Sequence, residues 1–138
     1  MTYRIGVIGL GQRIAHVLAA MKDAGFPFEL AGYSDPAPVG LPILDAHDIP
    51  RGPDRGVLND LLAAGPYDLL MIGSPNHLHY EHLLAAMETR RPIFTEKPIV
   101  RTEEETLALA RHLRDKSVPP IFVGLVMRSM PIVREVIS

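Results

Sequence analysis

The feature that most constrains the fold is a short apolar run that ends in two closely spaced glycines near the start of the chain. Residues 5–8 read Ile-Gly-Val-Ile, which is typical of a strand buried on both faces of a parallel sheet. Gly9-Leu10-Gly11 follows directly, and apolar residues within 12–22 then recur at helical spacing, with Gly25 just beyond the last turn. This order predicts a strand, a glycine turn and a helix in immediate succession.

The same alternation continues along the chain. Apolar runs predict further strands at 28–33, 68–73, 92–95 and 121–125. Helical spacing predicts helices at 57–64, 77–89 and 102–116, the last opened by a capping box of Thr102 with Glu105. Strands that alternate with helices in this way predict an α/β fold with a doubly wound parallel sheet. The exception is the span 36–55, whose five prolines predict irregular chain with at most one helical turn near 43–47.

Composition excludes several classes of function. A length of 138 residues, 47% of them apolar and 22% charged, suits one ordered globular domain. The formal net charge of −2 creates no field that would attract nucleic acid or an anionic membrane, so neither partner is expected. The absence of cysteine excludes disulfides, thiolate metal sites and thiol catalysis. No run resembles a signal peptide or a membrane span, so a cytoplasmic location is expected.

The glycine turn points to a nucleotide. Gly9 permits the tight turn, Gly11 lets the backbone approach a pyrophosphate, and the N-terminus of the next helix offers amide donors and the positive end of its dipole. The third position of this fingerprint holds Ile14 rather than glycine or alanine, so the match is partial. A plain connection between strand and helix is the alternative interpretation.

Asp35 ends the second predicted strand. A carboxylate there can accept hydrogen bonds from both ribose hydroxyls of an adenosine, and it would repel the 2′-phosphate of NADP. The predicted cofactor is therefore NAD, with NADP possible. The alternative is a turn aspartate, which is common before a proline such as Pro36.

Ser74-Pro75-Asn76 follows the third predicted strand and places small and polar groups at the ligand edge of the sheet. Asn76 could equally cap the helix that follows. Three histidines stand at 77, 79 and 82, but the first two diverge on a helix and no carboxylate converges with them. No metal site is expected.

Glu96-Lys97-Pro98 follows the fourth predicted strand at the same edge. The ammonium group of Lys97 could polarise a substrate hydroxyl or carbonyl beside a bound nicotinamide and assist proton transfer. The alternative is a solvated surface lysine paired with Glu96.

In this order along the chain, Gly9-Leu10-Gly11, Asp35, the segment 74–79 and Glu96-Lys97-Pro98 resemble the N-terminal domain of the Gfo/Idh/MocA family, that of glucose-fructose oxidoreductase and inositol dehydrogenase. The resemblance runs from about residue 3 to 131, although the proline-rich span 36–53 replaces the helix that is usual in the family. It implies a Rossmann domain that binds NAD(P), with Lys97 as the catalytic lysine. The residues implied to bind the cofactor are Gly9, Gly11, Gln12, Arg13, Ile14, Asp35, Ser74, Pro75, Asn76, His79, Glu96, Lys97 and Arg128.

The resemblance also implies that residues 1–126 form the cofactor domain and that 127–138 lead into a second α/β domain absent from this chain. That domain would supply the remaining catalytic groups and the interface of a homo-oligomer. The chain is expected to be part of an NAD(P)-dependent oxidoreductase that transfers hydride between nicotinamide and a sugar, polyol or related hydroxy compound, and to be inactive by itself. One alternative is a non-catalytic nucleotide-binding or regulatory module. Another is a Rossmann dehydrogenase of amino-acid biosynthesis, although the Glu96-Lys97-Pro98 motif disfavours it.

Overall fold

The computed structural model describes residues 1–114 and 117–124. Its centre is a five-stranded sheet in the order β2-β1-β3-β4-β5, and every neighbouring pair is parallel. The predicted doubly wound parallel sheet is confirmed, and each predicted strand is present. The strands are β1 (Tyr3–Ile8), β2 (Phe28–Ser34), β3 (Leu69–Ile72), β4 (Ile93–Thr95) and β5 (Ile121–Val123).

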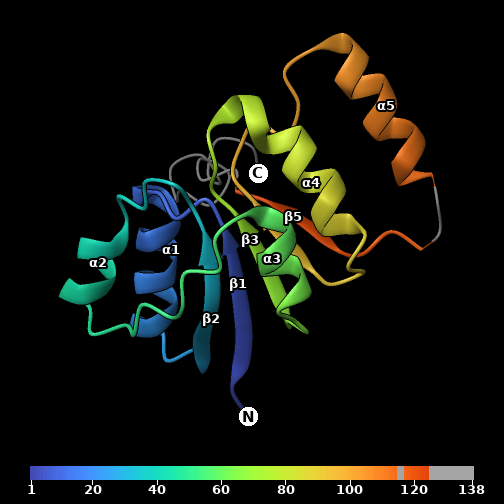
Figure 1. The fold of residues 1–138 in the computed structure, drawn as a ribbon. Helices are drawn as coiled ribbons and strands as arrows, with labels where there is room; N and C mark the ends of the chain where they lie inside the picture. The colour runs from blue at the N-terminus through green and yellow to red at the C-terminus, as the bar shows by residue number, and fades with distance from the viewer. Residues whose placement is uncertain (115–116, 125–138) are drawn as a thin grey trace, which may run out of the picture.

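Helices cover both faces of this sheet. Figure 1 shows α1 and α2 on one side of the sheet, and α3 and α4 on the other. The predicted helix at 77–89 is divided, because a single 3-10 turn, η1, precedes α4. The helices are α1 (Gln12–Asp23), α2 (Leu41–Ala46), α3 (Leu58–Ala63), η1 (Asn76–Leu78), α4 (His79–Met87) and α5 (Glu103–Leu113).

Two apolar layers lie on the two faces of the sheet. Alternate side chains of β1 enter different layers: Ile5 and Val7 pack with α1 and α2, whereas Ile8 packs with the layer of α3 and α4. Because both faces are covered, the central strands bury nearly every side chain, which explains the continuous apolar runs in the sequence. The helical residues of the first layer are Ile14, Ala15, Leu18, Ala19 and Leu44, and those of the second are Leu61, Leu83, Ala86 and Leu109.

The proline-rich span contains more helix than expected. Pro42 lies at the start of α2, where a missing amide hydrogen costs no helical hydrogen bond, so the six-residue helix tolerates it. Further along, Asp54 forms an isolated parallel bridge with Tyr33 at the outer edge of β2. The amide of Tyr33 donates to Pro53 O (3.1 Å), and the amide of Arg55 donates to Tyr33 O (2.8 Å). The span is therefore fastened to the sheet although it adds no full strand.

The predicted capping box of α5 is present with one difference. Thr102 Oγ1 accepts a hydrogen bond from the amide of Glu105 at 3.0 Å, as expected. The Glu105 carboxylate accepts at 2.7 Å from the amide of Arg101, one residue before the cap. The first contact satisfies an amide that the first turn of the helix leaves free, and the second ties the residue before the cap to that turn.

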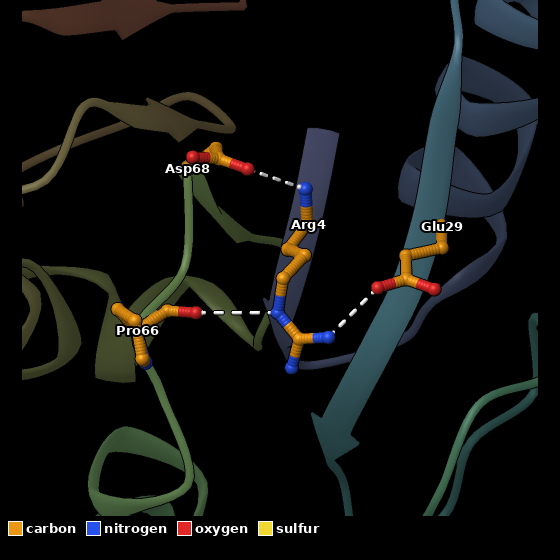
Figure 2. A network of polar contacts seen from close by, with 4 residues as sticks. All are labelled: Arg4, Glu29, Pro66 and Asp68. Atoms are coloured by element: carbon orange, nitrogen blue, oxygen red, sulfur yellow. Dashed lines mark hydrogen bonds and ion pairs between the residues drawn. The ribbon is translucent and has the colours of Figure 1, made fainter. Parts of the chain in front are cut away.

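A polar network joins three chain segments at the end of the sheet where the strands begin. In Figure 2 the Arg4 guanidinium lies between Glu29 Oε1 (2.7 Å) and Pro66 O (3.4 Å), and the Arg4 amide donates to Asp68 Oδ2 (2.7 Å). An exposed ion pair of this kind adds only about 0–1 kcal/mol of stability. Its clearer consequence is geometric, because it aligns the first residues of β1 and β2 with the entry into β3.

The predicted connecting segment 127–138, including Arg128, lies outside the described residues. Within residues 1–114 and 117–124, no helix is long and apolar enough to cross a membrane.

Candidate functional site

The loops that follow the first four strands meet at one edge of the sheet. Because the strands are parallel, their carboxyl ends lie together, and the connections after β1, β2 and β3 surround a cleft of about 840 Å³. The cleft residues include both fingerprint glycines, Asp35 and Ser74, which the sequence predicted separately. The first three predicted motifs therefore belong to a single site.

The turn after β1 requires glycine at its first position. Gly9 has a φ of +81°, and a Cβ built on it would lie 2.3 Å from the backbone nitrogen of Ser74. Both the dihedral angle and the space exclude a side chain, because the turn touches the loop after β3. The predicted tight turn at Gly9 is confirmed.

A glycine that directly follows β3 leaves the space that Ile14 fills. Ile14 is fully buried, and a Cβ built on Gly73, just after β3, would lie 2.0 Å from Ile14 Cγ1 and 2.7 Å from Gly9 O. The fingerprint normally obtains close packing of helix and strand from a small residue on the helix. Here the small residue is Gly73, so α1 approaches the sheet closely despite the isoleucine.

Gly11 forms a cradle rather than a packing contact. It has ordinary extended dihedral angles and lines both hollows, and among the described residues a Cβ there would contact only Gly73 O, at 3.5 Å. Beyond it, α1 presents the free amide groups of its first turn, which attract anions. The exposed Arg13 guanidinium adds a positive charge nearby. These residues fit a pyrophosphate group.

The far end of the cleft fits an adenosine. Asp35 Oδ1 accepts a hydrogen bond from the amide of Ala37 at 2.8 Å, so the turn interpretation of this aspartate is confirmed. The second carboxylate oxygen has no hydrogen bond in the described part of the chain, which leaves Asp35 able to serve a ligand as well. Apolar side chains that suit a base are Pro36, Val39, Val57, Leu58 and Leu78. A second carboxylate, Asp54, lines the same cleft, and none of its described lining residues is a lysine or arginine.

The loop after β3 lies between two hollows. Ser74 is buried and lines both the large cleft and a second hollow of about 360 Å³. Asn76 opens η1 and lines the second hollow, while η1 and α4 have no side-chain cap, so the alternative of Asn76 as an N-cap is wrong. Ser74 Oγ lies 2.7 Å from Nδ1 of His82, one turn into α4. Burial lowers the pKa of His82, which favours the neutral ring beside the cleft.

The second hollow brings Arg13, Glu96 and Lys97 together at the end of β4. Lys97 is exposed, whereas Glu96 is only 6% exposed. The Glu96 carboxylate pairs with Arg13 Nε at 3.4 Å, and not with Lys97 as the surface-lysine alternative requires. Glu96 Oε2 is the oxygen of this ion pair, but it accepts no hydrogen bond among the described residues, so it can still accept one from a ligand. The exposed side chain of Lys97 lines the same hollow.

Most predicted site residues lie at these two hollows, but the sequence did not predict the apolar residues at the adenosine end of the cleft or three further cleft residues. Gly73, Asp54 and His82 line the large cleft. Gly73 repeats the strand-end glycine seen at Gly9, and His82 is one helical turn after His79, so both carried a local signal. Asp54 lies in the proline-rich span, where no local sequence signal marks it as a site residue. In the described part of the chain, no group of three or more histidines and carboxylates could hold a metal ion.

Residues 3–125 match the model of the oxidoreductase family with an NAD-binding Rossmann fold, the Gfo/Idh/MocA family. Among curated proteins, the inositol 2-dehydrogenase of Corynebacterium glutamicum is 26% identical over 128 residues, which cover 93% of this chain and 38% of that protein. The levoglucosan dehydrogenase of Pseudarthrobacter phenanthrenivorans is 45% identical over 47 residues, covering 34% of this chain and 12% of that protein.

Solved structures show the same fold. The myo-inositol dehydrogenase of Lactobacillus casei, in complex with NAD(H) and myo-inositol, superposes with a TM-score of 0.80 at 23% identity, covering 98% of this chain and 40% of that one. The WlbA dehydrogenase of Thermus thermophilus, in complex with NAD and UDP-GlcNAcA, superposes with a TM-score of 0.75 at 28% identity, covering 99% and 45%. The chain thus spans less than half the length of each of these relatives.

Proposed function

Because the chain belongs to the Gfo/Idh/MocA oxidoreductase family, whose N-terminal domain is an NAD-binding Rossmann fold, we propose that it binds NAD across the carboxyl edge of its sheet. The observation that carries the proposal is the cradle at Gly11, where the backbone lies open to the cleft between Asp35 and Lys97. In this arrangement Asp35 holds the adenosine ribose, and the first turn of α1 with Arg13 holds the pyrophosphate.

The nicotinamide end then lies at the second hollow. Ser74, Pro75, Asn76 and His79 form or support its wall, and Glu96 Oε2 accepts a hydrogen bond from the cofactor. Bound nicotinamide supplies a site that accepts or donates hydride. Lys97 is exposed at the rim, where its ammonium group can hold the substrate oxygen and stabilise the charge that develops there as its proton moves.

The proposed substrate is a sugar, polyol or related hydroxy compound. The dehydrogenases named above act on such molecules, and a lysine that orients a hydroxyl oxygen suits this chemistry. We assign residues 1–126 to the cofactor domain and 127–138, with Arg128, to the approach to a second domain that completes the active site. The full-length protein is proposed to be a homo-oligomer.

Calorimetric titration of this chain with NAD tests the central claim. We expect saturable binding, and a Gly11→Ala variant separates cofactor binding from folding. The added methyl group meets no atom of the described residues closer than 3.5 Å, so the thermal unfolding midpoint should change little. It enters the cradle, so NAD affinity should fall by about tenfold or more. A folded wild-type sample that produces no binding heat at millimolar NAD would contradict the proposal.

A further inference from the structure

His79 begins α4, and its ring is buried between the loops that follow β3 and β4. The residue is only 2% exposed. Its Nε2 lies 2.5 Å from Ser74 O, and its Nδ1 lies 2.6 Å from Pro98 O. Carbonyl oxygens only accept hydrogen bonds, so in each contact the ring nitrogen is the donor. One side chain therefore connects two loops that are separated in the sequence.

These contacts leave His79 no ring nitrogen for a ligand. Its carbon atoms can line the second hollow, but both polar atoms already face protein carbonyls. Any polar influence of His79 on a bound molecule must therefore pass through the residues that it holds. This separates His79 from Glu96, whose buried Oε2 has no hydrogen-bond partner in the described part of the chain.

The residue held most directly is Lys97. On one side of Lys97, the amide of Glu96 donates to Ile72 O at 2.9 Å, which fastens β4 to β3. On the other side, Pro98 O meets the His79 ring. The backbone of Lys97 is thus fixed immediately before and immediately after the residue, while its side chain stays exposed.

We propose that His79 is a positioning residue, which fixes the Lys97 backbone and the nicotinamide end of the cleft relative to Ser74. The proposal rests on the proposed function, in which Lys97 acts beside bound nicotinamide. It predicts that loss of the His79 contacts disturbs one end of the cleft. The adenosine end is built from Asp35 and α1, whose contacts do not involve His79.

The first test compares NAD with ADP-ribose, which lacks the nicotinamide ring, by calorimetry. For His79→Phe, an apolar ring of similar size, we expect NAD affinity to fall by about tenfold while ADP-ribose affinity changes by less than about twofold. His79→Gln keeps one donor and should lose less NAD affinity. His77→Gln, which replaces an exposed histidine two residues away, should bind both ligands as the wild type does. Equal losses for the two ligands would overturn the proposal.

A second test needs no cofactor and so separates failure of this proposal from failure of NAD binding. The chain has three lysines, at 22, 97 and 116, so lysine-selective ¹⁵N labelling produces three backbone amide signals. In His79→Phe and His79→Gln we expect the Lys97 signal to move and its hydrogen exchange to accelerate by about tenfold, because the loop opens locally. The Lys22 signal should stay unchanged in both variants. An unaltered Lys97 signal in a folded variant would overturn the positioning role, whatever the result with NAD.

Discussion

Ile14 occupies the space that a side chain on Gly73 would need: a Cβ at position 73 would lie 2.0 Å from Ile14 Cγ1. The two residues belong to different parts of the chain, yet their sizes compensate. The helix after the glycine turn can carry a large apolar residue because the loop after β3 carries none. The chain therefore departs from the glycine fingerprint by placing the small residue at position 73, after β3, instead of at position 14 on the helix.

This compensation predicts a coupling that a double-mutant cycle can measure. Gly73→Ala should destabilise the domain by about 3 kcal/mol through overpacking, and Ile14→Ala by a similar amount through a cavity. Combined, they should cost at least about 1 kcal/mol less than the sum, because the smaller residue on α1 makes room for the new methyl group. Urea unfolding measures each free energy.

The matched control for this cycle pairs Gly73→Ala with Leu61→Ala. Leu61 is equally buried but belongs to the apolar layer on the other face of the sheet. Those two changes should be additive. Additivity in the Ile14 cycle as well would mean that the two side chains do not compete for one space.

Cofactor choice is predicted to depend on Asp35. Asp35→Asn removes the charge that repels a 2′-phosphate and weakens the hold on the ribose. We expect NAD affinity to fall by about tenfold, while NADP affinity stays constant or rises. Calorimetric titration with both nucleotides measures the ratio. Asp23→Asn, at the exposed end of α1, should leave both affinities unchanged, and a parallel loss of NAD and NADP binding in Asp35→Asn would count against the charge argument.

Stability should decline with acid through His82. Burial lowers the pKa of His82 in the folded state below its ordinary value of 6.5. At a pH between the folded-state and unfolded-state pKa values, the unfolded state therefore binds a proton that the folded state does not. This contribution to stability is complete above pH 6.5 and is lost as the pH falls toward the folded-state pKa. The difference in unfolding free energy between wild type and His82→Gln should therefore shrink from pH 7.5 to pH 5.5, roughly one unit on either side of the ordinary value. A difference that is constant over this range would refute the assignment.

Loss of Lys97 is predicted to abolish turnover but not cofactor binding. In a protein that joins this domain to a substrate domain of the family, Lys97→Met should lower kcat by about 100-fold or more, the usual contribution of a group that assists proton transfer. NAD affinity, measured on the same protein, should change little, because Lys97 lies exposed at the rim of its hollow. Full turnover by Lys97→Met would remove the proposed role.

The parallel sheet could be predicted because its strands are buried on both faces and must be continuously apolar. The positions of Asp35 and Lys97 at one edge followed from the same logic, since all the strands of a parallel sheet end on one side. The contact between Ile14 and Gly73 could not be predicted, because it depends on the distance between two elements. The same holds for His79, whose neighbours Ser74 and Pro98 follow different strands.

Asp54 shows another limit of sequence patterns. It carries no local signal, and only the fastening of its segment beside Tyr33 brings it to the cleft. The full extent of α2 is hidden in the sequence because proline usually breaks a helix, whereas Pro42 lies in the first turn, where proline is tolerated.

The fastened proline-rich span has a consequence for how the domain behaves in concentrated solution. An open sheet ends in a strand whose free amides and carbonyls can recruit a strand from another molecule, which leads to aggregation. Along β2 that edge is occupied at Tyr33 by the segment 53–55. This segment includes Pro53, which has no amide hydrogen that could bond to a strand from another molecule. The proline-rich span, which replaces the helix usual in the family, thus also covers part of an exposed edge, so this side of the domain should resist strand addition.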